Sequence, residues 1–336
     1  MGPSQWRARG GRRLLGLVCA IWASLYAVTF AAAVEPPAGA GDQIAAPIER
    51  PNASAQAQSA WRAYASGDYA SALRTSLLAA ANDDVDAKVI AGHILFHGLG
   101  APRDPARGLG FLRAAAALDH PDALAALGMI AATGADHSLD FSEAPGFLTR
   151  AVQAGRKDAA FALGQFKLTG AFGPTDKAGA KALFELAAEA GLVDARHALG
   201  LLLADNSLAF ADPPAARLAF EQAAQAGHRR AATDLGLMHY RGEGGATSLE
   251  EAARWFDVAA EAGEAEAQFL LCVMRARGEG APRDLEASYY WALRAFDSDP
   301  QIDLRLGEIL TTLRAALPVE AKQRAEAAAR EIAPTP

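Results

Sequence analysis

Residues 231–263 read AATDLGLMHYRGEGGATSLEEAARWFDVAAEAG. Apolar side chains recur at intervals of three and four residues up to Arg241, which is the pattern of an amphipathic helix. Gly242 opens a glycine-rich stretch that can supply the positive φ angle of a helix C-cap. Ser248 can cap a second helix, because Glu251 follows three residues later as in a capping box. The stretch therefore predicts a helix, a glycine turn and a second helix.

The same pattern recurs along the chain with a spacing of 36 residues. One position holds glycine in five successive units and Cys272 in the sixth; the glycines are Gly92, Gly128, Gly164, Gly200 and Gly236. Another position holds alanine in all six units: Ala87, Ala123, Ala159, Ala195, Ala231 and Ala267. A fixed period without insertions is typical of a repeat protein. We therefore expect six helix-turn-helix units over residues 87–300.

Large apolar residues follow the same period, at Leu112, Leu148, Phe184, Phe220 and Phe256. Small residues let neighbouring helices approach closely, and large ones fill the remaining gaps. A single helix pair cannot bury its apolar face, whereas stacked pairs share one core. The sequence thus predicts an all-α fold, an α/α superhelical solenoid with a concave inner surface. Residues 59–86 are expected to form an N-terminal capping helix pair, and residues 301–332 C-terminal capping helices.

The recurrent residues match the pattern of a known family. In the fifth unit they are Ala231, Leu235-Gly236, Tyr240, Gly242, Trp255, Ala259-Ala260 and Gly263. Over residues 87–300 the chain resembles the Sel1-like repeat, a relative of the tetratricopeptide repeat. The fourth unit departs from the pattern, with Asp205-Asn206 where the turn glycine is expected. The resemblance implies a helical array whose first helices bind a protein or peptide partner.

The first 33 residues have the pattern of an export signal. Four arginines precede an apolar run from Leu14 to Ala33, which ends in three alanines. We expect cleavage after Ala33; the alternative is an uncleaved membrane anchor, because the run is long enough to span a bilayer. Both interpretations place the rest of the chain outside the cytoplasm, in a bacterial periplasm or envelope. Residues 34–58, which contain four prolines, are expected to form a flexible linker.

The 336-residue chain is 51% hydrophobic and 21% charged, which excludes disorder as a description of the whole. Its 32 basic and 39 acidic residues give a net charge of −7. Without the four arginines of residues 1–33 the net charge is −11, which argues against nucleic acid as a partner. Of its two cysteines, only Cys272 lies beyond residue 33, so the exported chain cannot form an internal disulfide.

No common catalytic or phosphate-binding motif occurs in the sequence. His93 and His97 have the i, i+4 spacing of a zinc-ligand pair, but the equivalent positions of other units hold Met129 and Thr133, or Leu201 and Asp205. We therefore interpret the two histidines as polar residues near a turn. Cys272 replaces a glycine and is interpreted as a small buried residue, not a nucleophile. We therefore predict no catalytic residue, no cofactor and no metal.

The predicted function is that of a non-catalytic periplasmic scaffold or adaptor that binds a protein or peptide in its concave groove. Relatives with an export signal act in envelope assembly or restrain a membrane sensor, and the resemblance implies that range. Positions of the first helices that differ between units are the expected contacts. They are Arg196, His197, His239, Tyr240, Arg241, Gln268 and Arg275. Membrane contact is expected only through an uncleaved N-terminal segment.

The alternative function is that of a cell-wall hydrolase, because some secreted relatives are labelled as β-lactamase or penicillin-binding proteins. Those relatives carry a pair of cysteines in each unit, and this chain has no such pairs. The sequence also offers no activated nucleophile. The scaffold interpretation is therefore favoured over the hydrolase.

Overall fold

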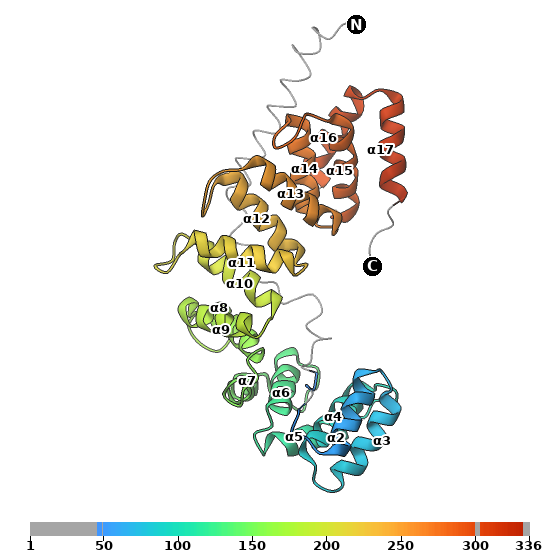
Figure 1. Cartoon of the computed structure of the whole chain (residues 1–336), viewed down its shortest axis with the longest axis vertical. Helices are drawn as coiled ribbons and strands as arrows, with labels where there is room; N and C mark the ends of the chain where they lie inside the picture. The colour runs from blue at the N-terminus through green and yellow to red at the C-terminus, as the bar shows by residue number, and fades with distance from the viewer. Residues whose placement is uncertain (1–45, 49, 300–302, 332–336) are drawn as a thin grey trace. The chain divides into compact units, whose positions relative to one another are not determined.

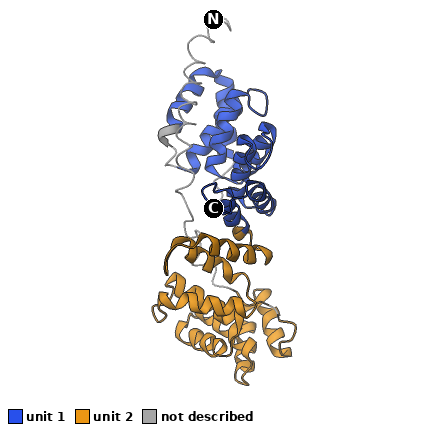
Figure 2. Cartoon of the chain, turned by 90° about the vertical axis from the view of Figure 1, so that its left-hand side faces the viewer, with its two compact units in different colours: residues 1–33, 196–336 blue, residues 34–195 orange. Residues whose placement is uncertain are grey.

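The computed structural model describes residues 46–48, 50–299 and 303–331, and every regular element in these ranges is helical. The chain divides into two compact units (Figure 2), an N-terminal unit within residues 34–195 and a C-terminal unit within residues 196–336. The boundary falls inside one helix, α10 (Val193–Ala204). The predicted export signal, residues 1–33, lies outside the described residues.

The N-terminal unit is a series of antiparallel helix pairs (Figure 1). Its helices are α2 (Ala55–Ala65), α3 (Tyr69–Ala80), α4 (Val85–His97), α5 (Pro105–Ala116), α6 (Pro121–Thr133), α7 (Ala144–Gln153), α8 (Ala159–Thr169) and α9 (Lys177–Glu189), with a short 3-10 turn η1 (Phe141–Glu143) before α7. From α2 to α9, each helix packs against the next one along the chain. The core of the unit is therefore built from neighbours in sequence.

The C-terminal unit continues the same alternation. Its helices after α10 are α11 (Pro213–Gln225), α12 (Arg229–Arg241), α13 (Leu249–Glu261), α14 (Ala265–Arg277), α15 (Leu285–Ser298), α16 (Asp303–Ala316) and α17 (Val319–Glu331). From α11 to α15 each helix packs against the next, and α15 also contacts both α16 and α17. The predicted all-helical repeat fold is confirmed. None of the helices in the described part of the chain is both long and apolar enough to cross a membrane.

The recurrent glycine and the recurrent large residue face each other in five successive helix pairs. A Cβ atom added to Gly128 would lie 2.6 Å from Cγ of Leu148, and one added to Gly164 would lie 2.5 Å from Cε1 of Phe184. Leu148 and Phe184 are completely buried. The glycine is therefore needed because the partner helix places a large side chain where its Cβ would be.

Most first helices end at a glycine in the left-handed conformation, with φ near +70° at Gly98, Gly170 and Gly242. The fourth repeat has no glycine there, and its turn is formed differently. The Asp205 carboxylate accepts hydrogen bonds from the Ser207 amide at 3.0 Å and from the Ser207 hydroxyl at 2.6 Å. An aspartate that accepts from the amide two residues ahead forms an Asx turn, which replaces the glycine cap.

Candidate functional site

The seven predicted contact residues lie on the first helices of three successive repeats. Arg196 and His197 are on α10, His239, Tyr240 and Arg241 on α12, and Gln268 and Arg275 on α14. Arg196 is partly buried. The other six have intramolecular partners, which determine what each side chain can offer a ligand.

His197 is part of a small polar cluster. Its Nε2 lies 2.7 Å from Oδ2 of Asp234, and its ring stacks on that of His228 at 4.3 Å between centroids. His228 also caps α12, since its Nδ1 accepts a hydrogen bond from the Ala231 amide at 3.0 Å. The cluster thus connects α10 to the start of α12 and has a structural role within the C-terminal unit.

Tyr240 and Arg241 both contact glutamates in turns. Glu279 lies in the turn after α14, and Glu243 lies in the turn after α12. The Tyr240 hydroxyl donates to Oε2 of Glu279 at 2.9 Å, and burial together with this carboxylate raises the pKa of Tyr240 to about 12. Arg241 lies 3.8 Å from Oε1 of Glu243. Arg275 pairs with Asp257 on α13 at 3.1 Å. These three side chains are partly buried and already engaged with neighbouring groups.

Gln268 lies in the interior, so its prediction as a partner contact is corrected. It is 0% exposed, and its Nε2 donates to the carbonyl of Ala260 at 3.0 Å. The residues of the same register in three other repeats, Leu124, Ala160 and Ala232, are also buried. At these four positions, variation along the column therefore reflects packing between helices and not contact with solvent.

A groove opens on the surface of the C-terminal unit between α11, α12 and α13, with a volume of about 530 Å³. We call it the Trp255 groove; its lining residues are Pro214, Arg217, Leu218, Glu221, Gln225, His239, Glu251, Arg254 and Trp255. Apolar surface comes from Trp255, Pro214 and Leu218, the last of which is 55% exposed. Of the seven predicted residues, His239 lines this groove.

His239 and Arg217 are in direct contact within the groove. An Nη of Arg217 donates to the His239 ring, and its distance to Nε2 is 3.1 Å. Burial, reinforced by the positive charge of Arg217, lowers the pKa of His239 below its usual 6.5. The imidazole is therefore neutral at neutral pH, and the positive charge in contact with it comes from Arg217, with the carboxylates of Glu221 and Glu251 also near the ring.

The residues that sequence analysis missed here belong to the second helices. Arg217 and Leu218 are on α11, and Arg254 and Trp255 are on α13. Trp255 stands next to Phe256 in the sequence; Phe256 is completely buried, whereas Trp255 is partly exposed in the groove. The available signal was Arg254, a charged residue directly before the tryptophan.

Cys272 and His93, two residue types with possible chemical roles, both lie in the interior. The thiol of Cys272 is fully buried beside the Ser288 hydroxyl, and burial raises its pKa to about 12. His93 is buried, and its Nδ1 lies 3.1 Å from the Tyr64 hydroxyl. Over residues 46–48, 50–299 and 303–331, no three His, Cys, Asp or Glu side chains are placed to share a metal ion.

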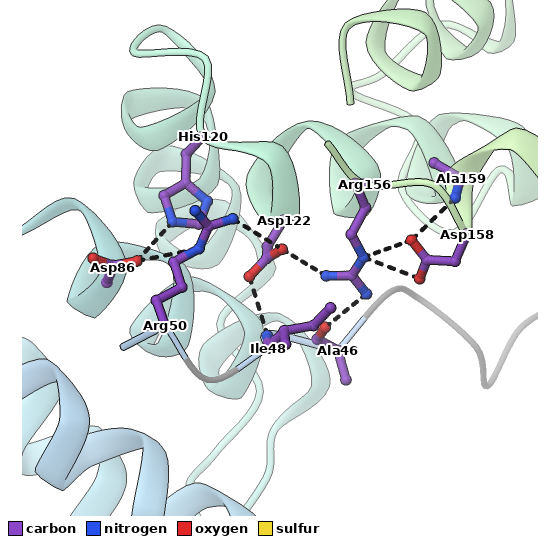
Figure 3. A network of polar contacts seen from close by, with 9 residues as sticks. All are labelled: Ala46, Ile48, Arg50, Asp86, His120, Asp122, Arg156, Asp158 and Ala159. Carbon is purple, nitrogen blue, oxygen red and sulfur yellow. Dashed lines mark hydrogen bonds and ion pairs between the residues drawn. The ribbon is translucent and has the colours of Figure 1, made fainter. Parts of the chain in front are cut away.

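A second polar arrangement lies on the N-terminal unit, at the starts of α4, α6 and α8 (Figure 3). We call it the docking row; it consists of Asp86, His120, Asp122, Arg156 and Asp158. Nε2 of His120 lies 3.0 Å from Asp86, Nη1 of Arg156 donates to Oδ1 of Asp122 at 2.6 Å, and Nε of Arg156 donates to Asp158 at 2.7 Å. The row therefore links three successive first helices.

The docking row holds a piece of the chain that was expected to be flexible. Ala46, Ile48 and Arg50 fall within the predicted linker 34–58, yet each contacts the row (Figure 3). The helix α2 also begins at Ala55, inside that linker. The prediction of a uniformly flexible linker is therefore corrected for this part, because the repeats supply polar partners for its backbone.

Comparison with protein families found four matches along the chain. The family model described as Sel1 repeat matches residues 86–120, 157–192, 229–264 and 265–300. The two stretches between them form the same helix pairs, α6 with α7 and α10 with α11, but one has the extra turn η1 and the other the Asx turn. None of the curated proteins compared with this chain matches it.

Two solved structures resemble the chain over most of its length. A Sel1 repeat protein from Oxalobacter formigenes is 25% identical with a TM-score of 0.62, over 72% of this chain and 100% of that one. A protective antigen of uropathogenic Escherichia coli strains, described as displaying an SLR fold, is 22% identical with a TM-score of 0.53, over 82% of this chain and 67% of that one. The similarity supports the helical repeat fold.

Proposed function

Because the chain is a Sel1-like repeat protein, and such repeats generally serve protein interaction, we propose that it is a non-catalytic scaffold that holds a segment of a protein partner in the Trp255 groove. The observation that carries this proposal is the composition of the groove. Tryptophan and arginine are the residues that most often dominate binding energy at protein interfaces, and both line it.

The charges of the groove give it a means of selecting a partner. Arg217 and Arg254 supply positive charge, and Glu221 and Glu251 supply negative charge along the same walls. Opposite charges at a rim favour a partner with the complementary order and disfavour others. We expect the bound segment to place an apolar side chain against Trp255 and charged groups on either side of it.

The compartment proposed for this activity is the bacterial periplasm or envelope. Support comes from the basic, then apolar, then small-residue order of residues 1–33. Within that compartment, the partner would be a protein of envelope assembly or a membrane sensor. N-terminal sequencing of the chain recovered from an envelope fraction tests the export; a mature protein that begins at Val34 is expected, and recovery of the intact chain from the cytoplasm would contradict it.

Photocrosslinking in living cells tests the groove itself. A photoreactive residue at Leu218, which lines the groove and is exposed, should capture a protein partner. The matched control is the same residue at Thr311, an exposed position on α16 that does not line the groove. Equal capture at both positions, or no capture at Leu218, would argue against this function.

Two substitutions on α13 separate recognition from folding. Trp255→Ala should lower partner capture at least tenfold, because it removes the tryptophan side chain that lines the groove. Val258→Ala, an exposed position on the same helix outside the groove, should leave capture unchanged. Circular dichroism of both variants confirms that the helices are intact. Capture that survives Trp255→Ala would place the partner elsewhere.

A further inference from the structure

The stretch that ends at Arg50 contacts the docking row through alternate residues (Figure 3). The carbonyl of Ala46 accepts from Nη2 of Arg156 at 3.1 Å, and the amide of Ile48 donates to Oδ2 of Asp122 at 3.1 Å. The Arg50 guanidinium lies 3.5 Å from both Asp122 and Asp86. A spacing of two residues is that of an extended chain presenting one edge.

Recognition in this contact uses the backbone, one proline and one cation. The side chains of Ala46 and Ile48 are exposed, Ile48 at 54%, whereas Pro47 between them is buried. The row therefore makes no use of the side chains at 46 and 48. It contacts the carbonyl before Pro47, the amide after Pro47 and the positive charge of Arg50, three residues beyond the proline.

The central pair of the row is buried, and the segment completes its hydrogen bonds. Asp122 is 2% exposed and Arg156 is 7% exposed. Burying charges is costly unless every polar atom is hydrogen-bonded. The Arg156–Asp122 ion pair uses one oxygen and one amino group; the segment partners the second of each, through Ile48 and Ala46. The surface is thus complementary to an extended backbone.

The 36-residue period places the row in equivalent positions of successive repeats. Asp86, Asp122 and Asp158 occupy one register at the second residue of α4, the second residue of α6 and the N-cap of α8. An acidic residue in a first helical turn commonly stabilises the helix dipole. Asp122 does more, because its carboxylate bonds to two residues far away in sequence, Arg156 and Ile48.

We propose that the docking row is a peptide-binding surface for an extended partner segment with a proline followed three residues later by Lys or Arg. Residues 46–48 and Arg50 are then a built-in occupant, which the partner displaces. This rests on the proposed scaffold function and names the chemistry of a partner segment. An occupant on a short tether has an effective concentration on the order of millimolar. A free peptide therefore binds weakly until the tethered segment is released.

Fluorescence anisotropy on the full chain tests the exchange, with a labelled synthetic peptide that has the sequence of residues 45–51. Ile48→Pro removes the amide that donates to Asp122, and the Ile48 side chain is exposed, so the substitution acts on the segment and leaves the row intact. We expect the peptide to bind Ile48→Pro at least tenfold more tightly than the unchanged chain. Ile48→Val, which keeps the amide, should behave like the unchanged chain.

Changes in the peptide keep the test independent of protein folding. A peptide with Glu in place of the residue equivalent to Arg50 should lose at least tenfold in affinity for Ile48→Pro, because it would face Asp86 and Asp122. Equal affinity of the two peptides, or no gain in Ile48→Pro with an unchanged thermal transition, would overturn the inference. Crosslinking from Leu218 reports on the Trp255 groove separately, so the two proposals can fail independently.

Discussion

A Cβ atom added to Gly236 on α12 would lie 2.5 Å from Cε1 of Phe256 on α13. The same relationship holds between Gly200 and Phe220, at 2.6 Å. Phe256 is completely buried, so its ring has no free space to move into. The recurrent glycine and the recurrent large apolar residue of neighbouring helices therefore form one packing unit, repeated every 36 residues.

Gly236→Ala should lower the free energy of unfolding by about 1–3 kcal/mol, because the methyl group overpacks a full core. This loss must exceed the gain of about 1 kcal/mol that alanine normally brings to a helix interior. Gly110→Ala is the matched control: this exposed helical glycine has no neighbour within 4 Å of the added Cβ, and the substitution should stabilise the chain. Urea unfolding of both variants measures the difference, and a shift of the same sign in both would contradict the packing argument.

The sixth repeat exchanges the sizes of the same two positions. Cys272 occupies the position that holds glycine in the other repeats. Ala292, 36 residues after Phe256, occupies the position of the large apolar residue. Both are completely buried. Ala292→Phe alone should destabilise the chain by overpacking, whereas adding Cys272→Gly should restore much of the loss. A double-mutant cycle by urea unfolding should give a coupling free energy of about 1 kcal/mol or more; additive effects would show that the two positions do not share one space.

The burial of Cys272 also predicts its reactivity. The thiol is fully buried and burial raises its pKa to about 12, so almost no thiolate forms at neutral pH. In a chain that begins at Val34 it is the only thiol. We expect no reaction with a disulfide reagent in the folded chain and stoichiometric reaction in denaturant. Rapid modification under native conditions would place Cys272 on an accessible surface and reopen a chemical role for it.

The 36-residue period was enough to predict the helices and the pairing of glycine with a large apolar residue, because those features repeat and each unit confirms the next. It could not locate Gln268 correctly. A single glutamine in a column of Leu124, Ala160 and Ala232 suggests surface variation, although Gln268 is buried and its amide nitrogen donates to the Ala260 carbonyl. Periodicity alone does not say which side of a first helix faces the neighbouring helix.

The docking row was missed for a different reason. Its carboxylates share one register, at Asp86, Asp122 and Asp158, which the period could have revealed. Its cation, Arg156, and its occupant, Ile48, lie outside that register and 108 residues apart. Contacts to a segment without any period depend on the folded geometry of three repeats together. A sequence pattern can therefore predict the repeated residues of such a site, but it cannot predict the residues that occur in it once.

Glu266 on α14 lowers the stability of the folded chain to an extent that depends on pH. Its side chain is partly buried, and two other carboxylates, Asp234 and Glu264, lie near it. Burial, reinforced by these negative charges, raises the pKa of Glu266 from 4.5 to about 6. Above that pH the folded chain must hold an ionised carboxylate in an unfavourable site, with only partial compensation from Arg241 and Arg230.

Because its folded pKa exceeds the unfolded value, Glu266 binds a proton more tightly in the folded chain, so stability falls as pH rises from about 4.5 through about 6. The loss corresponds to about 2 kcal/mol at neutral pH. Glu266→Gln should therefore stabilise the chain by up to about 2 kcal/mol at neutral pH and have little effect below pH 4.5. Urea unfolding across this range measures it, with the exposed Glu308→Gln as control. A stabilisation that does not change with pH would show that shape, and not ionisation, sets the cost at Glu266.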